Sequence, residues 1–125
     1  MLVIGLPPTS GSPARPANAG PGEAVRGASS AEVGVASYYA HRYHGRPTAS
    51  GEVFDLHQLT AAHPRYAFGT RVKVTHLGNN RSIIVRINDR GPFIQGRVID
   101  LSLAAAEELQ MVQGGLAQVK LEIVQ

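Results

Sequence analysis

The chain has 125 residues, the size of one domain, and its hydrophobic content of 43% is ordinary for a globular protein. Cysteine is absent, which excludes disulfide bonds, thiolate metal sites, a cysteine nucleophile and a lipid-modified cysteine within this sequence. No apolar run approaches the ~20 residues that a membrane-spanning helix needs, so we expect no transmembrane segment.

The net charge is +3, and ten of the twelve basic residues are arginine, which binds planar carboxylates and phosphates better than lysine does. The basic residues are scattered along the chain, and no zinc-finger, basic-helix or RNA-recognition motif is present. We therefore expect no nucleic-acid partner. An anionic glycan would suit the same modest positive charge.

The N-terminal segment, residues 1–33, is rich in Pro, Gly, Ser and Ala and predicts a disordered leader or linker ahead of one domain at 34–125. Met1–Leu6 is apolar but too short for the hydrophobic part of a signal peptide. Ala17-Asn18-Ala19 has the small residues of a cleavage site. A truncated secretory leader and an artificial start of the expressed chain both fit this pattern.

Strands are predicted where β-branched and aromatic residues alternate with polar ones. The clearest are a hairpin of Arg71–His76 and Arg81–Ile87 around the turn Leu77–Asn80, and a last half-buried strand over Val119–Ile123. Further apolar segments with strand character are Val35–Tyr39, Leu59–His63 and Arg97–Leu101.

A single helix is predicted at Leu103–Met111, with Ser102 as its N-terminal cap and Gly114-Gly115 as its stop. The inventory is about six short strands, one short helix and two long polar loops, without the alternation of strands and helices that a parallel sheet requires. A small closed β-barrel fits it best, because closure leaves no exposed strand edge.

The strand predicted at Arg81–Ile87 is followed at its end by a carboxylate residue, Asp89. In Asn88–Phe93, Asp89 ends a strand, and Gly91 and Pro92 force the chain to turn immediately afterwards. Such a turn holds side chains at a rim, as catalytic loops do. For an isolated segment, an exposed ion pair of Asp89 with Arg90, contributing only ~0–1 kcal/mol, is the favoured interpretation, and only the other segments of the chain change this.

Three ionisable residues lie in loops or at element ends, namely Glu52, His63 and Asp89. Cleavage of a glycosidic bond needs a carboxylic acid to protonate the leaving oxygen and a second polar group to manage the charge at the sugar. Sequence spacing alone does not establish that the three meet in space.

Six sequence blocks follow one another between Gly34 and Val124. They are Gly34-x-Ala36-Ser37-x-Tyr39, His44-Gly45-Arg46-x-Thr48-Ala49-Ser50-Gly51-Glu52-x-Phe54-Asp55, Leu59-Thr60-Ala61-Ala62-His63, Phe68-Gly69-Thr70-x-Val72-x-Val74, Asn88-Asp89-Arg90-Gly91-Pro92-Phe93 and Arg97-x-Ile99-Asp100-Leu101-Ser102-x-Ala104-Ala105. Together, these blocks resemble the rare lipoprotein A family of septal peptidoglycan lytic transglycosylases.

The resemblance implies a mainly β fold, a six-stranded double-psi β-barrel with one short helix. It also implies a carbon–oxygen lyase that cleaves between N-acetylmuramic acid and N-acetylglucosamine without water and leaves a 1,6-anhydro end. Family members prefer glycan strands stripped of peptide stems. The implied setting is cell wall remodelling and daughter-cell separation in a bacterial periplasm or cell envelope, with divisome proteins as candidate partners.

Mapped by motif, Asp89 matches the family's acid/base aspartate, and Glu52 and His63 match the other two polar residues of the groove. We expect Arg90 to point away from Asp89 and to brace the loop or a substrate carboxylate, because a paired arginine would lower the pKa of the acid. For Asp100, a structural role is favoured over a catalytic one, because it lies at a strand end before a helix whose N-terminus attracts negative charge.

Further substrate contacts are expected from aromatic, cationic and polar residues. Aromatic rings can stack on sugars, although packing in the core or at the rim is an equal alternative for Tyr39. Arginines attract the lactyl carboxylate of the glycan, and the loop histidines are better suited to solvent or sugar contact than to metal binding. The predicted set is Tyr39, His44, Arg46, Thr48, Arg90, Phe93 and Arg97. We expect no metal or other cofactor, and we expect the protein to be a monomer.

Two other functions fit the same residues. A non-catalytic, expansin-like module would use the groove to bind glycan without cleaving it. A simple glycosidase would transfer the sugar to water and leave reducing ends in place of anhydro ends.

Overall fold

The structure, a computed structural model, describes residues 31–124. The predicted leader therefore lies outside the described residues except for its last three positions, 31–33. Within residues 31–124 we find no helix long and apolar enough to cross a membrane.

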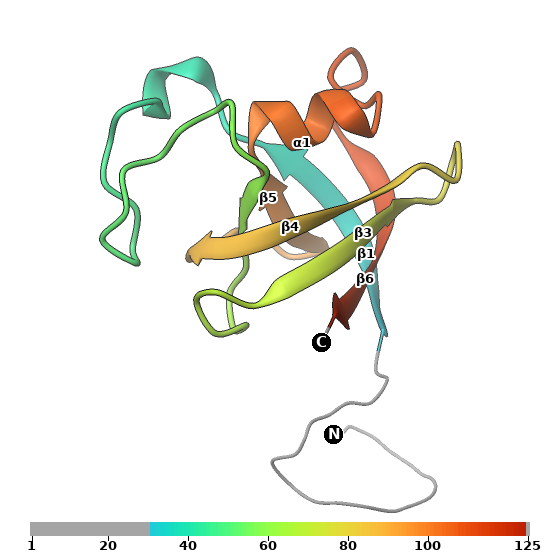
Figure 1. Cartoon of the computed structure of the whole chain (residues 1–125). Coiled ribbons are helices and arrows are strands. Elements are labelled where there is room, and N and C mark those ends of the chain that lie inside the picture. Colours follow the sequence, from blue (N-terminus) through green and yellow to red (C-terminus); the bar gives the residue numbers. More distant parts are fainter. Residues whose placement is uncertain (1–30, 125) are drawn as a thin grey trace, which may run out of the picture. The chain divides into compact units, whose positions relative to one another are not determined.

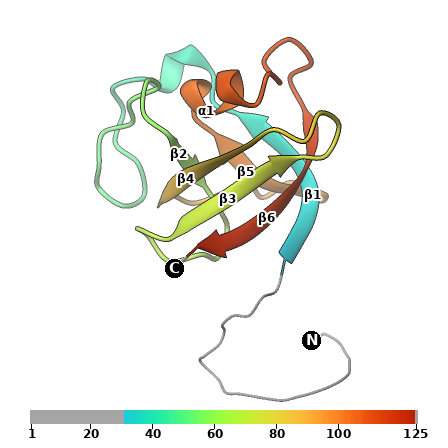
Figure 2. The same ribbon diagram turned by 45° about the vertical axis from the view of Figure 1, so that its right-hand side comes forward.

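Six strands close into a barrel, in the order β1-β5-β2-β4-β3-β6 around the circumference (Figures 1 and 2). The mainly β barrel with one short α-helix predicted from the sequence is confirmed. The elements are β1 Ala31–Tyr38, the 3-10 turn η2 His41–Tyr43, β2 Thr60–Ala62, β3 Arg71–His76, β4 Ser82–Asp89, β5 Arg97–Leu101, α1 Leu103–Glu108 and β6 Ala117–Val124.

Two parallel strand pairs interrupt an otherwise antiparallel barrel. β1 pairs with β5 in parallel and β2 pairs with β4 in parallel, while β2 and β5 are antiparallel neighbours. These pairings place the C-terminal ends of β1 and β4 on either side of the β5–β2 pair. The long loop between β1 and β2 crosses the same region (Figure 1).

The barrel interior is filled by the inward-facing residues that strand alternation predicts. Each of these side chains is buried, and none carries a polar atom. They include Val72 and Val74 of β3, Val85 and Ile87 of β4, Ile99 and Leu101 of β5, and Val119 and Leu121 of β6. Because these side chains point into the core, the other faces of β4 and β5 are the ones that can present functional side chains.

The helix α1 packs on the core through Ala105, Ala106 and the residue that follows its end, Leu109, all fully buried. Ser102 caps it as predicted, since its Oγ accepts a hydrogen bond of 3.3 Å from the amide of Ala105. The helix ends at Glu108, before the predicted Met111, because Gln110 adopts a left-handed backbone with φ of 57°.

The first strand begins earlier than the sequence predicts. β1 starts at Ala31, not Val35, because residues 31–36 pair with β6 along an antiparallel ladder. The ladder extends the strand into a segment whose small residues gave no alternation signal. Glu32, placed by composition in the leader, is thereby a strand residue of the barrel.

Candidate active site

A cleft of about 560 Å³ opens where β1, β4 and β5 end. Its walls combine two aspartates, three arginines and three tyrosines. The lining residues are Ser37, Tyr38, Tyr39, Ala40, Tyr43, Arg46, Pro47, Asp89, Arg90, Arg97 and Asp100.

The two aspartates lie in one row across the barrel wall. Strand register places Ser37 of β1 beside Asp100, Asp100 beside Ala62, and Ala62 beside Asp89. Neighbouring strands are ~4.8 Å apart, so the backbones of Asp89 and Asp100 are separated by roughly 10 Å and their side chains can approach from either side of β2. Two carboxyl groups therefore face one cleft.

Asp89 is held by three hydrogen bonds. Its Oδ2 accepts from the hydroxyl of Tyr39 at 2.5 Å, and its Oδ1 accepts from the amides of Ala49 at 2.8 Å and of Arg90 at 2.9 Å. Donors on three sides fix the orientation of the carboxylate. Both the strand end and the crossing loop thus position this residue.

Tyr39 joins Asp89 to an aromatic cluster. Its ring stacks on Phe54 at 4.6 Å between centroids and meets the edge of Tyr43 at 5.7 Å. Burial raises the pKa of Tyr39 far above its usual range, and the hydrogen bond to Asp89 and the charge of Asp100 raise it further. Tyr39 is therefore a fixed hydrogen-bond donor, and Tyr43, 37% exposed, leaves a ring open to the cleft.

Asp100 has a different environment from Asp89. Burial raises its pKa, and the neighbouring charge of Asp89 acts in the same direction. Hydrogen bonding from the Ser37 hydroxyl and the charge of Arg97 oppose the rise without cancelling it. The raised pKa means that Asp100 keeps its proton to higher pH than a fully exposed aspartic acid does.

The arginines of the cleft fall into two kinds. Arg46 and Arg97 line the cleft and form no ion pair within residues 31–124, although the charge of Arg97 acts on Asp100. Arg90 is engaged: its Nη1 donates to the carbonyls of His63 at 3.2 Å and Tyr66 at 2.7 Å. The prediction that Arg90 points away from Asp89 and braces the loop is confirmed.

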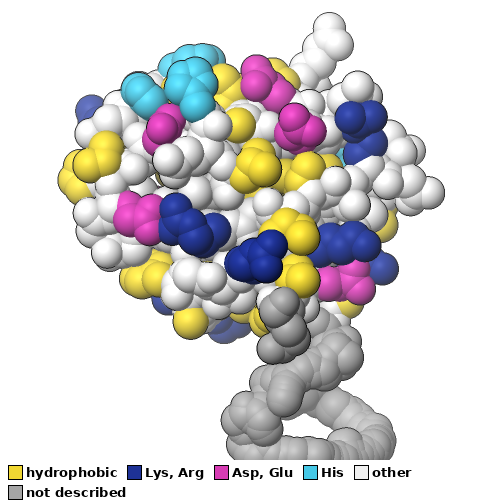
Figure 3. Space-filling model, viewed as in Figure 1, with side chains coloured by type: hydrophobic (Ala, Val, Ile, Leu, Met, Phe, Trp, Pro, Cys, Tyr) yellow, Lys and Arg dark blue, Asp and Glu magenta, His cyan; other side chains and the backbone are white. Residues whose placement is uncertain are grey.

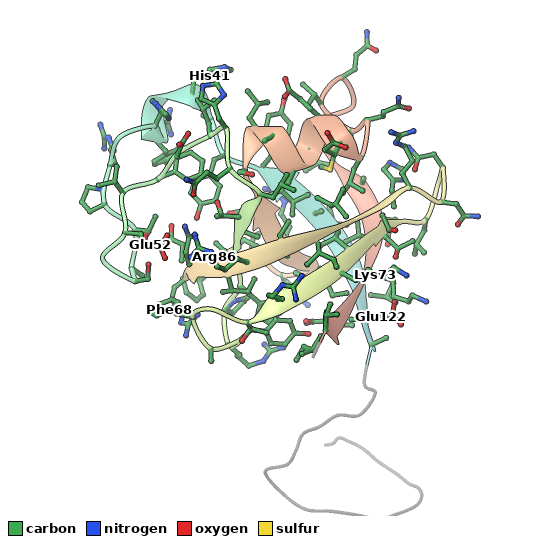
Figure 4. The ribbon with its side chains drawn as sticks, viewed as in Figure 1. His41, Glu52, Phe68, Lys73, Arg86 and Glu122 are labelled. Atoms are coloured by element: carbon green, nitrogen blue, oxygen red, sulfur yellow. The ribbon has the colours of Figure 1, made fainter. Side chains whose placement is uncertain are left out.

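Glu52 does not line the cleft. Its carboxylate accepts from both terminal nitrogens of Arg86 and, at 3.3 Å, from the amide of Asn88. Figure 4 shows Glu52 and Arg86 pointing toward each other, and Figure 3 shows acidic and basic side chains in contact on this face. Hydrogen bonding to Arg86, then to Asn88, lowers the pKa of Glu52. The arrangement ties the loop to β4 beside Asp89.

The side chain of His63 is fully buried and does not reach the cleft. Its Nε2 lies 2.8 Å from Oε1 of Glu32, and its ring stacks on Tyr66 with centroids 3.5 Å apart. Its backbone does reach the site, since the amide of His63 donates to the carbonyl of Asp89 at 3.2 Å.

The remaining predicted contacts are distributed unevenly. Tyr39, Arg46, Arg90 and Arg97 line the cleft, whereas His44, Thr48 and Phe93 do not. The Nδ1 of His44 accepts from a backbone amide at 3.2 Å, Thr48 donates to the carbonyl of Glu52, and Phe93 is 79% exposed.

Within residues 31–124 no group of three or more histidine and acidic side chains could hold a metal ion. The residues that sequence reasoning undervalued are Asp100 and Ser37. The available signal was alternation: Ile99 and Leu101 face the core, so Asp100 between them must face away from it.

The comparisons with known proteins agree with the fold. The model of a lytic transglycolase family matches residues 31–121. The chain is 56% identical over 92 residues to a protein of Synechocystis named "Probable endolytic peptidoglycan transglycosylase RlpA", covering 74% of this chain and 29% of that protein. It is 52% identical over 90 residues to the "Endolytic peptidoglycan transglycosylase RlpA" of Pseudomonas aeruginosa, covering 72% of this chain and 26% of that one. The chain thus spans about a quarter to a third of the length of these relatives.

Among solved structures, a Streptomyces papain inhibitor aligns with a TM-score of 0.64 at 25% identity, over 78% of this chain and 96% of its own. An expansin of Clavibacter michiganensis aligns with a TM-score of 0.61 at 18% identity, over 77% of this chain and 51% of its own, which shows the fold alone. With six strands closed as observed and a family model that matches from β1 into β6, the chain belongs to the double-psi β-barrel family of lytic transglycolases.

Proposed function

We propose that this domain is a peptidoglycan lytic transglycosylase. It cleaves the bond between N-acetylmuramic acid and N-acetylglucosamine without water and leaves 1,6-anhydro ends. The observation that carries the proposal is the pair Asp89 and Asp100, two carboxyl groups of unlike environment in one row of one cleft. The relatives named as peptidoglycan transglycosylases support the substrate class.

Asp100 carries the proton in this proposal. Protonating the glycosidic oxygen requires a carboxyl group that keeps its proton near neutral pH, and burial raises the pKa of Asp100 in that direction. The family resemblance gave this role to Asp89. The hydrogen bonds that Asp89 accepts from Tyr39 and two amides better suit a fixed carboxylate.

Asp89 stabilises the positive charge that develops at the sugar as the bond breaks. The proton of Asp100 passes to the leaving oxygen, and the bond from C1 to that oxygen breaks. The sugar's own C6 hydroxyl then bonds to C1 and returns its proton to Asp100. The cycle regenerates the acid and consumes no water.

In this proposal, two arginines of the cleft determine the choice of substrate. Arg46 and Arg97 line the cleft and would bind the lactyl carboxylate of the glycan, since an arginine fork binds a carboxylate with two parallel hydrogen bonds. This carboxylate is free only where the peptide stem has been removed, which favours peptide-poor strands. Such a role places the protein in the bacterial cell envelope, in wall remodelling and daughter-cell separation, acting as a monomer with divisome proteins as candidate partners.

Product chemistry tests the proposal. The purified chain is incubated with peptide-free and with intact peptidoglycan, and the ends are identified by mass spectrometry. We expect anhydromuramyl ends from the wild type on peptide-free strands and none from Asp89→Asn or Asp100→Asn. Reducing ends would identify a glycosidase, and binding without release would identify a non-catalytic, expansin-like module. Either result contradicts the proposal.

A further inference from the structure

His63, one member of the predicted polar trio, is fully buried and does not line the cleft. From its contacts we propose that His63 is a positioning residue, which together with Glu32 holds Arg90 and so aligns Asp89, and that its imidazole transfers no proton. The kinetic part of this inference rests on the proposed transglycosylase activity. The structural part does not.

Both ring nitrogens of His63 are occupied by the protein. Nδ1 accepts from the amides of Arg65 at 3.0 Å and Tyr66 at 3.1 Å, so it carries no proton. Nε2 must then bear the hydrogen, which it donates to Glu32 at 2.8 Å. With the ring fully buried and stacked on Tyr66, no nitrogen is left for a substrate.

Glu32 fixes this arrangement from β1. Its carboxylate also accepts from the guanidinium of Arg65 at 3.1 Å and from the hydroxyl of Tyr66 at 3.3 Å. Hydrogen bonding to His63 lowers the pKa of Glu32. A carboxylate with a neutral imidazole as donor is the arrangement that sets tautomer and ring orientation at other histidine sites. The ionisable groups around the ring are thus Glu32, Arg65 and Tyr66, with Arg90 beyond the turn.

The turn after His63 holds the side chain of Arg90. The carbonyls of His63 and Tyr66 both accept from Nη1 of Arg90, and its guanidinium lies over the ring of Phe68 at 4.1 Å. Phe68 lies near the C-terminal end of β4 (Figure 4). The same Nδ1 contacts that close the turn therefore set the spacing of the two carbonyls.

Arg90 and His63 both contact Asp89, so the position of the turn affects the cleft. The amide of Arg90 donates to Oδ1 of Asp89, and the amide of His63 donates to the Asp89 carbonyl. The backbone of Asp89 is therefore held from the His63 side, while Tyr39 and Ala49 hold its carboxylate from the other. If the turn relaxes, the carboxylate moves relative to the bound sugar.

Replacement of His63 by asparagine distinguishes a positioning role from a role in proton transfer. The Asn side-chain oxygen can accept from the following amides as Nδ1 does, because asparagine forms this turn in many proteins, but it cannot exchange protons as imidazole does. We expect His63→Ala to lower kcat by about 100-fold at unchanged KM, since misplacement of a reacting group by about 1 Å costs that much. His63→Asn should recover at least about tenfold of this loss and keep both limbs of the wild-type pH profile.

Variants of Glu32 give the same answer without touching the histidine. Glu32→Gln keeps an acceptor for Nε2, so kcat should stay within about threefold of the wild type, whereas Glu32→Ala should lower it about tenfold or more. A histidine that became charged during the reaction would need the carboxylate, and Glu32→Gln would then be as damaging as Glu32→Ala. Equal loss in the two Glu32 variants, or in His63→Ala and His63→Asn, overturns the inference.

A readout independent of turnover completes the test. Nitrogen NMR of the folded chain should show a neutral His63 with hydrogen on Nε2, unchanged on addition of a peptide-free muramyl oligosaccharide. Separate Nη signals of Arg90, expected in wild type and His63→Asn, should average in His63→Ala. If the wild type forms no anhydro ends, the proposed function fails while these signals still decide the role of His63. A His63 signal that shifts on glycan binding contradicts it.

Discussion

Two regions beside β4 hold carboxylates in different environments: the exposed pair of Glu52 with Arg86, and the cleft that holds Asp89 and Asp100. On the Arg86 side of the strand, Glu52 is paired with a guanidinium, and both side chains are more than a third exposed, at 42% and 40%. At its C-terminal end, the cleft places Asp89 near Asp100, and burial and like charge raise the pKa of Asp100, whereas hydrogen bonding to Arg86 lowers that of Glu52.

In the proposed mechanism, this difference gives three neighbouring acidic residues three roles. A proton donor needs burial and a neighbouring negative charge, which Asp100 has and Glu52 lacks. A charge stabiliser needs fixed hydrogen-bond donors, which Asp89 has. Glu52 fastens the crossing loop to Asn88, next to Asp89. Role therefore follows from the surroundings of each carboxylate and not from its residue type.

The largest expected effect is that of Asp100→Asn. Loss of a general acid lowers kcat by about 10²–10⁴-fold. The same change should raise Tm at neutral pH, because a folded-state pKa above the unfolded value means that the ionised carboxylate destabilises the fold. The gain should disappear below about pH 3.9, where the unfolded carboxyl is protonated too. Assays of anhydro ends and thermal unfolding at several pH values measure both. An active variant, or one less stable at neutral pH, would argue against the assignment.

The next effect is expected for Tyr39→Phe. The substitution removes the hydroxyl that donates to Asp89 but keeps the stack on Phe54. A hydrogen bond to a charged group contributes about 1.5–3 kcal/mol, so kcat should fall by about tenfold to 100-fold. KM should change little, since the hydroxyl is already engaged by the protein. Tyr43→Phe is the control, because its hydroxyl does not contact Asp89. A loss confined to KM would make Tyr39 a sugar contact, as the sequence suggested.

Sequence reasoning reached the parts of this site that depend on local pattern. Alternation placed Asp89 at a strand end, and Gly91, with φ of 119°, makes the turn that its flexibility predicted. The hairpin, β5 and the Ser102 cap also follow from residues close together in the chain.

What the sequence could not give depends on register between distant strands. Asp100 meets Asp89 only through the β5–β2 and β2–β4 pairings, and a bulge between Ala61 and Ala62 shifts the second of these. Likewise, among residues 31–124 the buried Nε2 of His63 has a hydrogen-bond acceptor only in Glu32 of β1, in a segment with the composition of a linker. Neither contact has a local signature.

A smaller effect is expected on the pH profile of Ser37→Ala. The Ser37 hydroxyl donates to Asp100 and lowers its pKa, so the substitution should raise that pKa further. Asp100 must be protonated to act as the acid, and activity should therefore persist to higher pH in the variant. At the acid end of the profile kcat should stay within about threefold of the wild type. A limb that moves to lower pH, or does not move, would assign it to another group.

The smallest effect is expected for Glu52→Gln. Because the pKa of Glu52 is lowered in the folded state, its pair with Arg86 stabilises the fold above the unfolded value of about 4.3 and loses this contribution as the pH falls through the folded pKa. Exposure and salt screening limit it to ~0–1 kcal/mol at neutral pH. Urea unfolding at neutral and acidic pH should show a small difference that shrinks in acid and in high salt. We expect kcat within about fivefold of the wild type, since an exposed ion pair carries no larger free energy. A loss as large as that of Asp100→Asn would mean that Glu52 enters the cleft when glycan binds, and would erase the distinction between the two sides of β4.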